Sequence, residues 1–567
     1  MLTYSVVNYK SKHTFSVLVG EESYDQRTTV QSELFKNYPT FTSSTDAFTK
    51  TNLATPFTGY PKLSKVRYTN LSFFGRVNYS FKDKYLFTFN MRADGASKFA
   101  PGLQWGYFPA GSIGWRIKNE NFLKNVNFIS DLKLRVGYGE LGNNRVGDYL
   151  YLPTFSNNGA YYYGINNQAI TAYYPASLPN PILQWESNVN RNLGLDISLF
   201  SNRINLSVDI YNNTSNHLLL NVPIASTYGY TTQLQNVGQT RNKGVEIQLS
   251  SQIVRKKNFS WSANFNMAFN KNTIEQLGLG QQFFYPAASW GVSGQPTDYI
   301  VKIGSPVGSM YGLVNDGFYK VSDFDYNTAT MVYTLKAGVV SNAGIIGTVQ
   351  PGSVKFKDLN GDGVVDLDKD RQIIGNPTPK FTGGLNQQFT YKRWDASVFV
   401  NFSYGNDIYN ANKIELTNGY TANANQLDIM AGRWKVVTAN GQTAQWVNSS
   451  GQSVGIAPDQ LAALNANATI WQPIKSAGAF YPSTWAIEDG SFLRINNVTI
   501  GYTAPMKSGG LITKLRFYLT GNNLAVITHY SGYDPEVSVR NSPLTQGLDY
   551  SAYPKSRSFI FGVNATF

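Results

Sequence analysis

Long segments in which apolar and polar residues alternate constrain this chain more than any other feature. Between residues 192 and 199, leucine or isoleucine fills every second position and asparagine, glycine, aspartate or serine fills the others. Segments 204–210 and 259–267 repeat the pattern. A period of two places successive side chains on opposite faces of a β-strand. Each segment runs for about 9–12 residues, the length that a tilted strand needs to cross a bilayer, whereas strands of soluble proteins average about 5–6.

The same pattern predicts about fifteen strands along the chain. They lie near 2–9, 14–23, 67–81, 84–93, 107–118, 130–141, 187–200, 203–216, 239–252, 257–270, 381–391, 394–409, 490–503, 513–523 and 557–567. Turns of a few residues alternate with long loops at 24–66, 142–186, 217–238, 271–380, 410–489 and 524–556. Long loops at one end and tight turns at the other are typical of outer-membrane barrels. We therefore expect an all-β fold, a transmembrane antiparallel β-barrel of large size.

Composition removes several other classes of protein. The 567 residues include no cysteine, which excludes disulfide scaffolds, cysteine-bound metals and thiol nucleophiles. The net charge of +13 is scattered over turns and forms no basic stripe, so we expect no nucleic-acid partner. His13, His217 and His529 lie far apart without a catalytic motif, and we expect no enzyme. There is no apolar run long enough for a transmembrane helix, and no signal-peptide pattern follows Met1.

The final strand carries a second signal for a membrane barrel. Phe559, Phe561, Val563 and Phe567 are apolar at alternating positions, and Phe567 ends the chain. This pattern looks like the terminal signal by which outer-membrane barrels are recognised for insertion.

Six blocks in order along the chain together resemble one family. They are FGRVNYSF at 74–81, GYFPAGSIGWR at 106–116, LKLRVGYG at 132–139 with GNN at 142–144, IGNPTPKF at 374–381, EDGSFLR at 488–494 and YSGYDPE at 530–536. The set resembles the SusC/RagA family of TonB-dependent outer-membrane transporters. The resemblance implies a plugged barrel of about 22 strands. It also implies import of glycan oligosaccharides or peptides, with the TonB complex and a SusD-like surface lipoprotein as partners.

Family members also carry a signal peptide, a TonB-contacting segment and an N-terminal plug domain, none of which we recognise in this sequence. About fifteen strands also leave about seven of the family's barrel unaccounted for. We therefore expect residues 1–567 to be the C-terminal part of a transporter barrel.

The segment DLNGDGVVD at 358–366 is the sharpest local motif. Asp358, Asn360, Asp362 and Asp366 place oxygen ligands at positions 1, 3, 5 and 9 of a calcium loop, with the Val364 carbonyl at position 7. Position 12 holds Lys369, so Asp370 or Asp368 would have to replace the usual glutamate. The alternative is a surface turn held by its own backbone bonds. We otherwise expect no required cofactor.

Two further groups are candidates for contact with substrate or lumen. Tyr161, Tyr162 and Tyr163 lie in a tyrosine-rich loop whose rings suit sugar stacking, or alternatively pack the loop or form an interfacial belt. Arg92, Arg135 and Arg494 occupy polar strand positions, where they either line the lumen and pair with carboxylates such as Asp94 or are simply solvated.

The sequence thus predicts a protein of the cell outer membrane, surrounded by its lipid, that takes part in nutrient import. The alternatives are a passive porin, which needs neither plug nor TonB, and a soluble β-rich binding protein.

Overall fold

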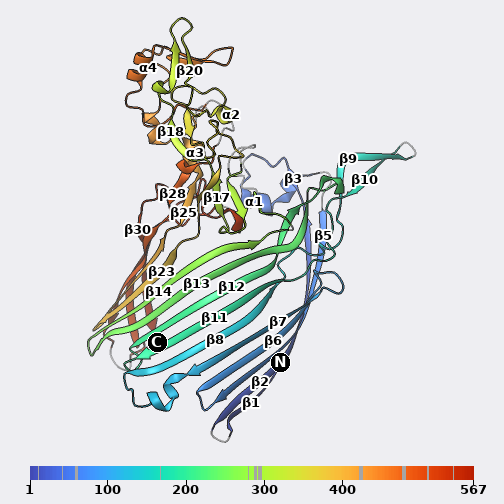
Figure 1. Cartoon of the computed structure of the whole chain (residues 1–567). Coiled ribbons are helices and arrows are strands. Elements are labelled where there is room, and N and C mark those ends of the chain that lie inside the picture. The colour runs from blue at the N-terminus through green and yellow to red at the C-terminus, as the bar shows by residue number, and fades with distance from the viewer. Residues whose placement is uncertain are drawn as a thin grey trace. The chain divides into compact units, whose positions relative to one another are not determined.

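The computed structural model describes residues 1–9, 12–40, 42–57, 62–165, 168–278, 280–286, 290, 297–419, 425–474, 481–506, 510–539 and 542–567. Fifteen strands form one sheet in chain order (Figure 1). They are β1 (Leu2–Tyr9), β2 (His13–Ser32), β5 (Lys62–Phe81), β6 (Tyr85–Ala96), β7 (Trp105–Arg116), β8 (Ile129–Asn143), β11 (Glu186–Leu199), β12 (Ile204–Pro223), β13 (Thr232–Lys256), β14 (Phe259–Gln276), β23 (Phe381–Tyr391), β24 (Trp394–Tyr404), β29 (Phe492–Ala504), β30 (Lys514–Thr528) and β32 (Ser558–Thr566).

This sheet confirms the predicted fold class and the predicted strand order. Each of the fifteen expected segments overlaps one strand of the sheet, and neighbours such as β5 and β6 pair antiparallel. The strands β1 and β32 lie at the two ends of the order, and the described residues show no pairing between them. The sheet is therefore open along these two edges.

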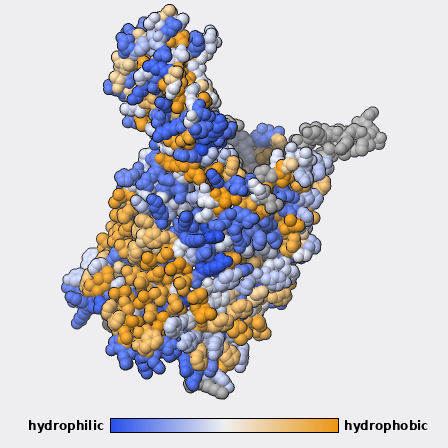
Figure 2. Space-filling model, viewed as in Figure 1, coloured by the Kyte–Doolittle hydropathy of each residue, from blue (hydrophilic) through white to orange (hydrophobic). Residues whose placement is uncertain are grey.

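One face of the sheet is apolar and exposed. On β6, Tyr85, Phe87, Phe89 and Met91 are exposed, and the residues between them are half-buried. Phe87 pairs with Ile113 of β7, whose side chain is 61% exposed. Hydrophobic residues likewise gather over β14 and β23 (Figure 2). Contiguous apolar surface of this extent is expected where a barrel meets hydrocarbon.

Tight turns join the strands at one end of the sheet. Lys82 and Asp83 have φ of 52° and 51° between β5 and β6, and Lys392 has φ of 53° between β23 and β24. Left-handed turn residues match the twist of the strands that they connect. The longer β7–β8 connection contains two short 3-10 turns, Ile117–Asn119 and Asn121–Leu123. Between these turns Glu120 accepts hydrogen bonds from the Lys84 ammonium, the Tyr85 hydroxyl and the Trp115 indole.

The predicted strand boundaries are wrong at the opposite end. The ladder of β2 and β5 continues to the Ser32–Lys62 pair, nine residues beyond the expected end of β2 at residue 23. Likewise β12 runs on to Pro223 and β13 begins at Thr232, so much of the expected 217–238 loop is strand. The extension of β2 lies past the apolar stretch of its strand, whereas the extension of β12 includes Leu218, Leu219 and Leu220.

Smaller elements occupy the long connections. They are β3 (Phe35–Lys36), α1 (Ser44–Thr49), β4 (Thr55–Pro56), β9 (Phe155–Ile165), β10 (Gln168–Pro175), β15 (Phe283–Phe284), β16 (Tyr299–Lys302), β17 (Ser309–Gly312), β18 (Asn315–Phe318), β19 (Phe324–Asn327), β20 (Val332–Leu335), α2 (Ala343–Ile346), β21 (Val354–Phe356), β22 (Gln372–Gly375), β25 (Asp407–Asn410), α3 (Ala411–Leu416), β26 (Gln445–Val447), β27 (Ser453–Gly455), α4 (Pro458–Leu464), β28 (Ile487–Asp489) and β31 (Leu548–Asp549). No helix in the described residues is long and apolar enough to cross a membrane.

The chain divides into two compact units. The first comprises residues 1–126, 132–194 and 212–239, and its small core contains Phe99 and Leu183. The second comprises residues 127–131, 195–211 and 240–567 and contains three cores built from its loops. In one core, Tyr299, Met310, Tyr409 and Leu548 are at most 1% exposed although they come from distant segments. The expected long loops 271–380 and 410–489 are therefore largely folded, which the alternation pattern does not reveal.

Candidate functional site

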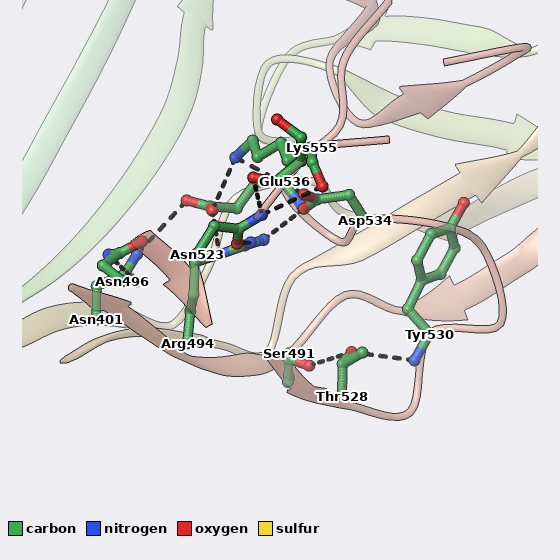
Figure 3. A network of polar contacts seen from close by, with 11 residues as sticks. Asn401, Ser491, Arg494, Asn496, Asn523, Thr528, Tyr530, Asp534, Glu536 and Lys555 are labelled. Carbon is green, nitrogen blue, oxygen red and sulfur yellow. Dashed lines mark hydrogen bonds and ion pairs between the residues drawn. The ribbon is translucent and has the colours of Figure 1, made fainter. Parts of the chain in front are cut away.

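Arg494 of β29 is the centre of a polar network on the face of the sheet opposite Leu493 (Figure 3). Its side chain is only 3% exposed, whereas the neighbouring Leu493 points to the apolar face and is 40% exposed. The Arg494 guanidinium lies 2.6 Å from the Asp534 carboxylate and 2.8 Å from the Glu536 carboxylate. Both acids belong to the segment that follows β30, so one arginine attaches this segment to the sheet.

Further contacts attach the same segment at several points. The Lys555 ammonium lies 3.0 Å from Glu536 and 3.9 Å from Asp534. Asn523 accepts a hydrogen bond from Arg494 and donates to the backbone carbonyls of Lys555 and Ser556. Both arms of the 529–557 connection are thus fixed to β29 and β30.

A second cluster, around Glu488 of β28, holds loop elements together. The Glu488 carboxylate accepts two hydrogen bonds of 2.8 Å from Ser531 and one of 3.1 Å from Asn410. The Lys413 ammonium lies 3.3 Å from Glu488. Burial acts to raise the pKa of Glu488, but the bonds from Ser531 and the charge of Lys413 outweigh it and hold the pKa below its usual value.

Next to this cluster, the Tyr530 hydroxyl donates a 2.5 Å hydrogen bond to the buried Asp549. Burial raises the pKa of Tyr530. Glu488 and Asp489 are adjacent but each is engaged separately, since Asp489 accepts hydrogen bonds from Ser491. The two carboxylates therefore do not form an acid–base pair.

The other predicted arginines lie elsewhere on the sheet. Arg92 of β6 contacts Asp94 at 2.7 Å and Glu22 of β2 at 3.0 Å. Arg135 of β8 is half-buried and lies opposite Gly114 of β7. The structure does not bring Arg92, Arg135 and Arg494 into one shared cluster in the described residues, so each acts within its own part of the sheet.

The acidic motif at 358–370 forms a compact turn. Asp358 accepts hydrogen bonds from the backbone of Gly361 and Gly363, and Asp370 accepts them from Leu359 and Asp366. Asn360 and Asp362 each accept from the amide two residues on, while the Val364 side chain is exposed.

Lys369 places its own positive charge within this turn. Its ammonium lies 3.1 Å from Asp362 and 3.5 Å from Asp366. The hydrogen bond to Asp362 raises the pKa of Lys369, and hydrogen bonds from Asn360 and from the Lys369 amide hold the pKa values of Asp362 and Asp366 below the usual range. In the described residues no group of three or more acidic or histidine side chains is arranged to hold a metal ion. The oxygen donors suit Ca²⁺, but the ammonium competes for them.

Two predicted groups of residues remain, the three tyrosines of the 142–186 loop and the apolar residues of the final strand. Tyr161, Tyr162 and Tyr163 belong to β9, and Tyr162 and Tyr163 pair with β10, but their side chains lie outside the described part of the structure. Phe559, Phe561 and Val563 lie on the edge strand β32 and are at least 50% exposed. Phe567 follows that strand and is 76% exposed.

Sequence reasoning did not identify the residues that contact Arg494 and Glu488. Asp534 and Glu536 lie within the recognised YSGYDPE block, which is the one signal that marks them. Lys413 and Asn410, which bind Glu488, carry no recognisable motif because they approach it only in the folded loops.

With the sheet and its polar inner network described, comparison with known proteins decides the family. A family model described as "TonB dependent receptor-like, beta-barrel" matches residues 3–445. The chain belongs to this family. It is an outer-membrane β-barrel protein of the SusC/RagA kind, as the sequence blocks predicted.

Individual relatives agree with this assignment. TonB-dependent receptor P3 of Formosa agariphila is 34% identical over 505 residues, which cover 88% of this chain and 45% of that protein. TonB-dependent receptor SusC of Bacteroides thetaiotaomicron is 30% identical over 515 residues, which cover 88% and 44%. The chain spans about half the length of the curated relatives it matches.

A solved structure shows the same fold. The RagAB peptide transporter superposes with a TM-score of 0.73 at 22% identity, covering 100% of this chain and 54% of that chain.

Proposed function

We propose that this chain takes part in the import of glycan oligosaccharides or peptides across the outer membrane, within a TonB-dependent transporter that works with a SusD-like surface lipoprotein. The observation that carries the proposal is the two-faced sheet, which is apolar and exposed on one side and bears the Arg494 network on the other. A passage for polar molecules requires such a polar interior.

The relatives support the nature of the cargo. One is named SusC, and the similar solved structures are described as a RagAB peptide transporter or importer. Family likeness favours oligosaccharides or peptides without choosing between them.

We propose further that residues 1–567 supply the C-terminal strands of the barrel, and that the plug and the TonB-contacting segment belong to another part of the transporter. Support comes from the half-length match to relatives and from the two unpaired sheet edges. Unpaired backbone groups are costly in hydrocarbon, so a stable barrel needs further strands to join them.

In this transporter, the folded loops would bind substrate. The 529–557 segment would stay attached to the polar face of β29 and β30. Arg494 and Lys555 together balance the charges of Asp534 and Glu536, so the segment would stay attached while substrate passes. No chemical step on the substrate is required.

Growth assays test the proposal. A strain lacking the gene should lose growth on particular oligosaccharides or peptides supplied as sole carbon source, and the restored gene should recover it. Import should also stop when TonB is removed. Uptake that persists without TonB would instead establish a passive porin, and unchanged growth on every substrate would contradict a role in import.

A further inference from the structure

A groove in the second unit is lined by three lysines and by no carboxylate in the described residues. It holds about 540 Å³ and lies between β13, β14 and the segment that precedes β23. Lys243, Lys271 and Lys380 line it together with the apolar residues Val245 and Phe269.

Two of the three lysines lie on the apolar face of the sheet. Lys243 is two residues from Val245 on β13, and Lys271 is two residues from Phe269 on β14, so each lysine shares a face with its apolar neighbour. Further along that face lie Ile247, Leu249, Met267 and Phe265 in the same alternation.

Lys380 belongs to the same surface. Its ammonium lies 6.0 Å from the centre of the Tyr404 ring, which stacks on Phe381, and Phe381 contacts Phe269. Its aliphatic stem lies over Gly405, where a Cβ would meet the lysine carbons at 2.8 Å. The three lysines therefore stand at the end of one ladder of apolar and aromatic side chains.

This end of the ladder is the loop side. The tight turn between β13 and β14 follows Lys256; Lys243 lies 13 residues before Lys256, and Lys271 lies 12 residues after Phe259, the first residue of β14. Both distances exceed the roughly 9–11 residues that cross the hydrocarbon. In outer-membrane barrels the long loops are extracellular, so the lysines reach the headgroup level of the outer leaflet.

None of the three lysines has an ion-pair partner within 4 Å in the described residues, although the charge of Lys380 acts on the nearby Asp407. Of the acids on these strands, Glu275 is paired with Arg241 at 3.0 Å, and Glu246 faces the opposite side of β13 from Lys243. Asn270 and Asn272 also line the groove, and each is fixed, Asn270 by the Tyr211 hydroxyl and Asn272 by the Val307 amide. A rigid concave wall with three ammonium groups suits a compact anion.

We propose that this groove binds the phosphate of an outer-leaflet lipid headgroup, with the acyl chains lying along the apolar ladder below it. Ammonium groups bind phosphate as point charges, and the adjoining apolar side chains distinguish a lipid from a free anion. The proposal concerns the lipid-facing surface and does not depend on the imported substrate.

Native mass spectrometry of the purified, delipidated transporter tests this inference. Phosphorylated lipid A and its enzymatically dephosphorylated counterpart are added back separately. The wild type should retain the phosphorylated form preferentially. The variant with Lys243→Gln, Lys271→Gln and Lys380→Gln should bind it about tenfold or more weakly, from the attraction of anionic headgroups for each lysine.

A matched variant controls for loss of charge. Lys256→Gln, Lys257→Gln and Lys392→Gln remove three charges from the turn ends of the same strands, and this variant should bind like the wild type. Equal retention by the two triple variants would overturn the proposal, as would equal retention of the dephosphorylated lipid. Displacement of bound lipid by millimolar inorganic phosphate would identify a free-anion site and would also overturn it. Heat modifiability on gels confirms that each variant is folded.

Discussion

Arg494 shows how a charged residue is accommodated on a strand that crosses a membrane. It points away from the apolar face, is almost fully buried, and contacts two carboxylates of one following segment. A buried charge is tolerated only when it is paired and hydrogen-bonded. The sequence predicts its inward position from alternation, but its partners lie 40 or more residues further along and only the fold shows them.

Replacing Arg494 by methionine should leave Asp534 and Glu536 without their main partner. Removal of one member of a buried ion pair costs about 3–5 kcal/mol. We expect a lower melting temperature in detergent and faster proteolytic cleavage between residues 529 and 557. Arg27→Met removes an exposed pair with Asp25 and should cost less than about 1 kcal/mol. Equal effects of the two substitutions would contradict an anchoring role.

Glu120 gives a pH-dependent prediction for the β7–β8 connection. Hydrogen bonds from Lys84, Tyr85 and Trp115 lower the pKa of Glu120 to about 2 from 4.5. Because the folded-state pKa is depressed, the stability that Glu120 contributes is present above about pH 4.5 and is lost as pH falls through about 2. Wild type should melt higher than Glu120→Gln at pH 7, and the difference should shrink steadily below pH 4.5. A difference that is independent of pH would contradict this.

At the scale of elements, the alternation predicts every strand of the sheet and misplaces several ends. The apolar face ends where the strand leaves the hydrocarbon, so the pattern stops there as well. Beyond it, β2 continues through Asp25, Gln26 and Arg27, which pair with β5 by backbone hydrogen bonds, with Asp25 also forming an ion pair with Arg67 at 3.0 Å. Such polar pairing needs no apolar pattern, so the alternation shows no signal for this extension.

The turn at 358–370 raises the question of calcium. We propose that its oxygen groups bind Ca²⁺ weakly because the Lys369 ammonium already lies between Asp362 and Asp366. Lys369→Met should increase the Ca²⁺ affinity about tenfold by removing a like charge. Isothermal titration calorimetry measures it, with Asp362→Asn plus Asp366→Asn as the control that abolishes binding. If Lys369→Met gives no heat at millimolar Ca²⁺, calcium binding is excluded and the segment is only a turn held by its own backbone bonds.

The edge strand β32 carries the predicted insertion signal. Phe559, Phe561 and Val563 lie exposed on it, and we propose that the insertion machinery recognises them there. We expect Phe567→Ser to lower the amount of assembled protein several-fold without changing the melting temperature of the fraction that assembles. Tyr553→Ser alters a residue that is 93% exposed outside the strand and serves as control. Normal assembly of Phe567→Ser would show that the signal lies elsewhere.

At the scale of the whole molecule, the main feature that could not be predicted from the sequence is the folding of the long loops. Their cores join residues such as Tyr299, Tyr409 and Leu548, which are separated by more than a hundred positions. Short strands and turns with this separation have no local period, so sequence reasoning reads them as loops. Ile374 in the family block at 374–381 does pack against one of these cores, but a resemblance identifies the block without showing this contact.

The open sheet leads to a final prediction about residues 1–567 in isolation. The edges β1 and β32 present unpaired backbone groups, which hydrocarbon cannot satisfy. We therefore expect this chain alone, refolded into lipid, to give neither a heat-modifiable monomer band nor steady conductance in a planar bilayer. It should instead associate through its edges into larger species, visible by light scattering in detergent. A monomer with steady conductance would show that fifteen strands close by themselves, and would favour a passive porin over a part of a coupled transporter.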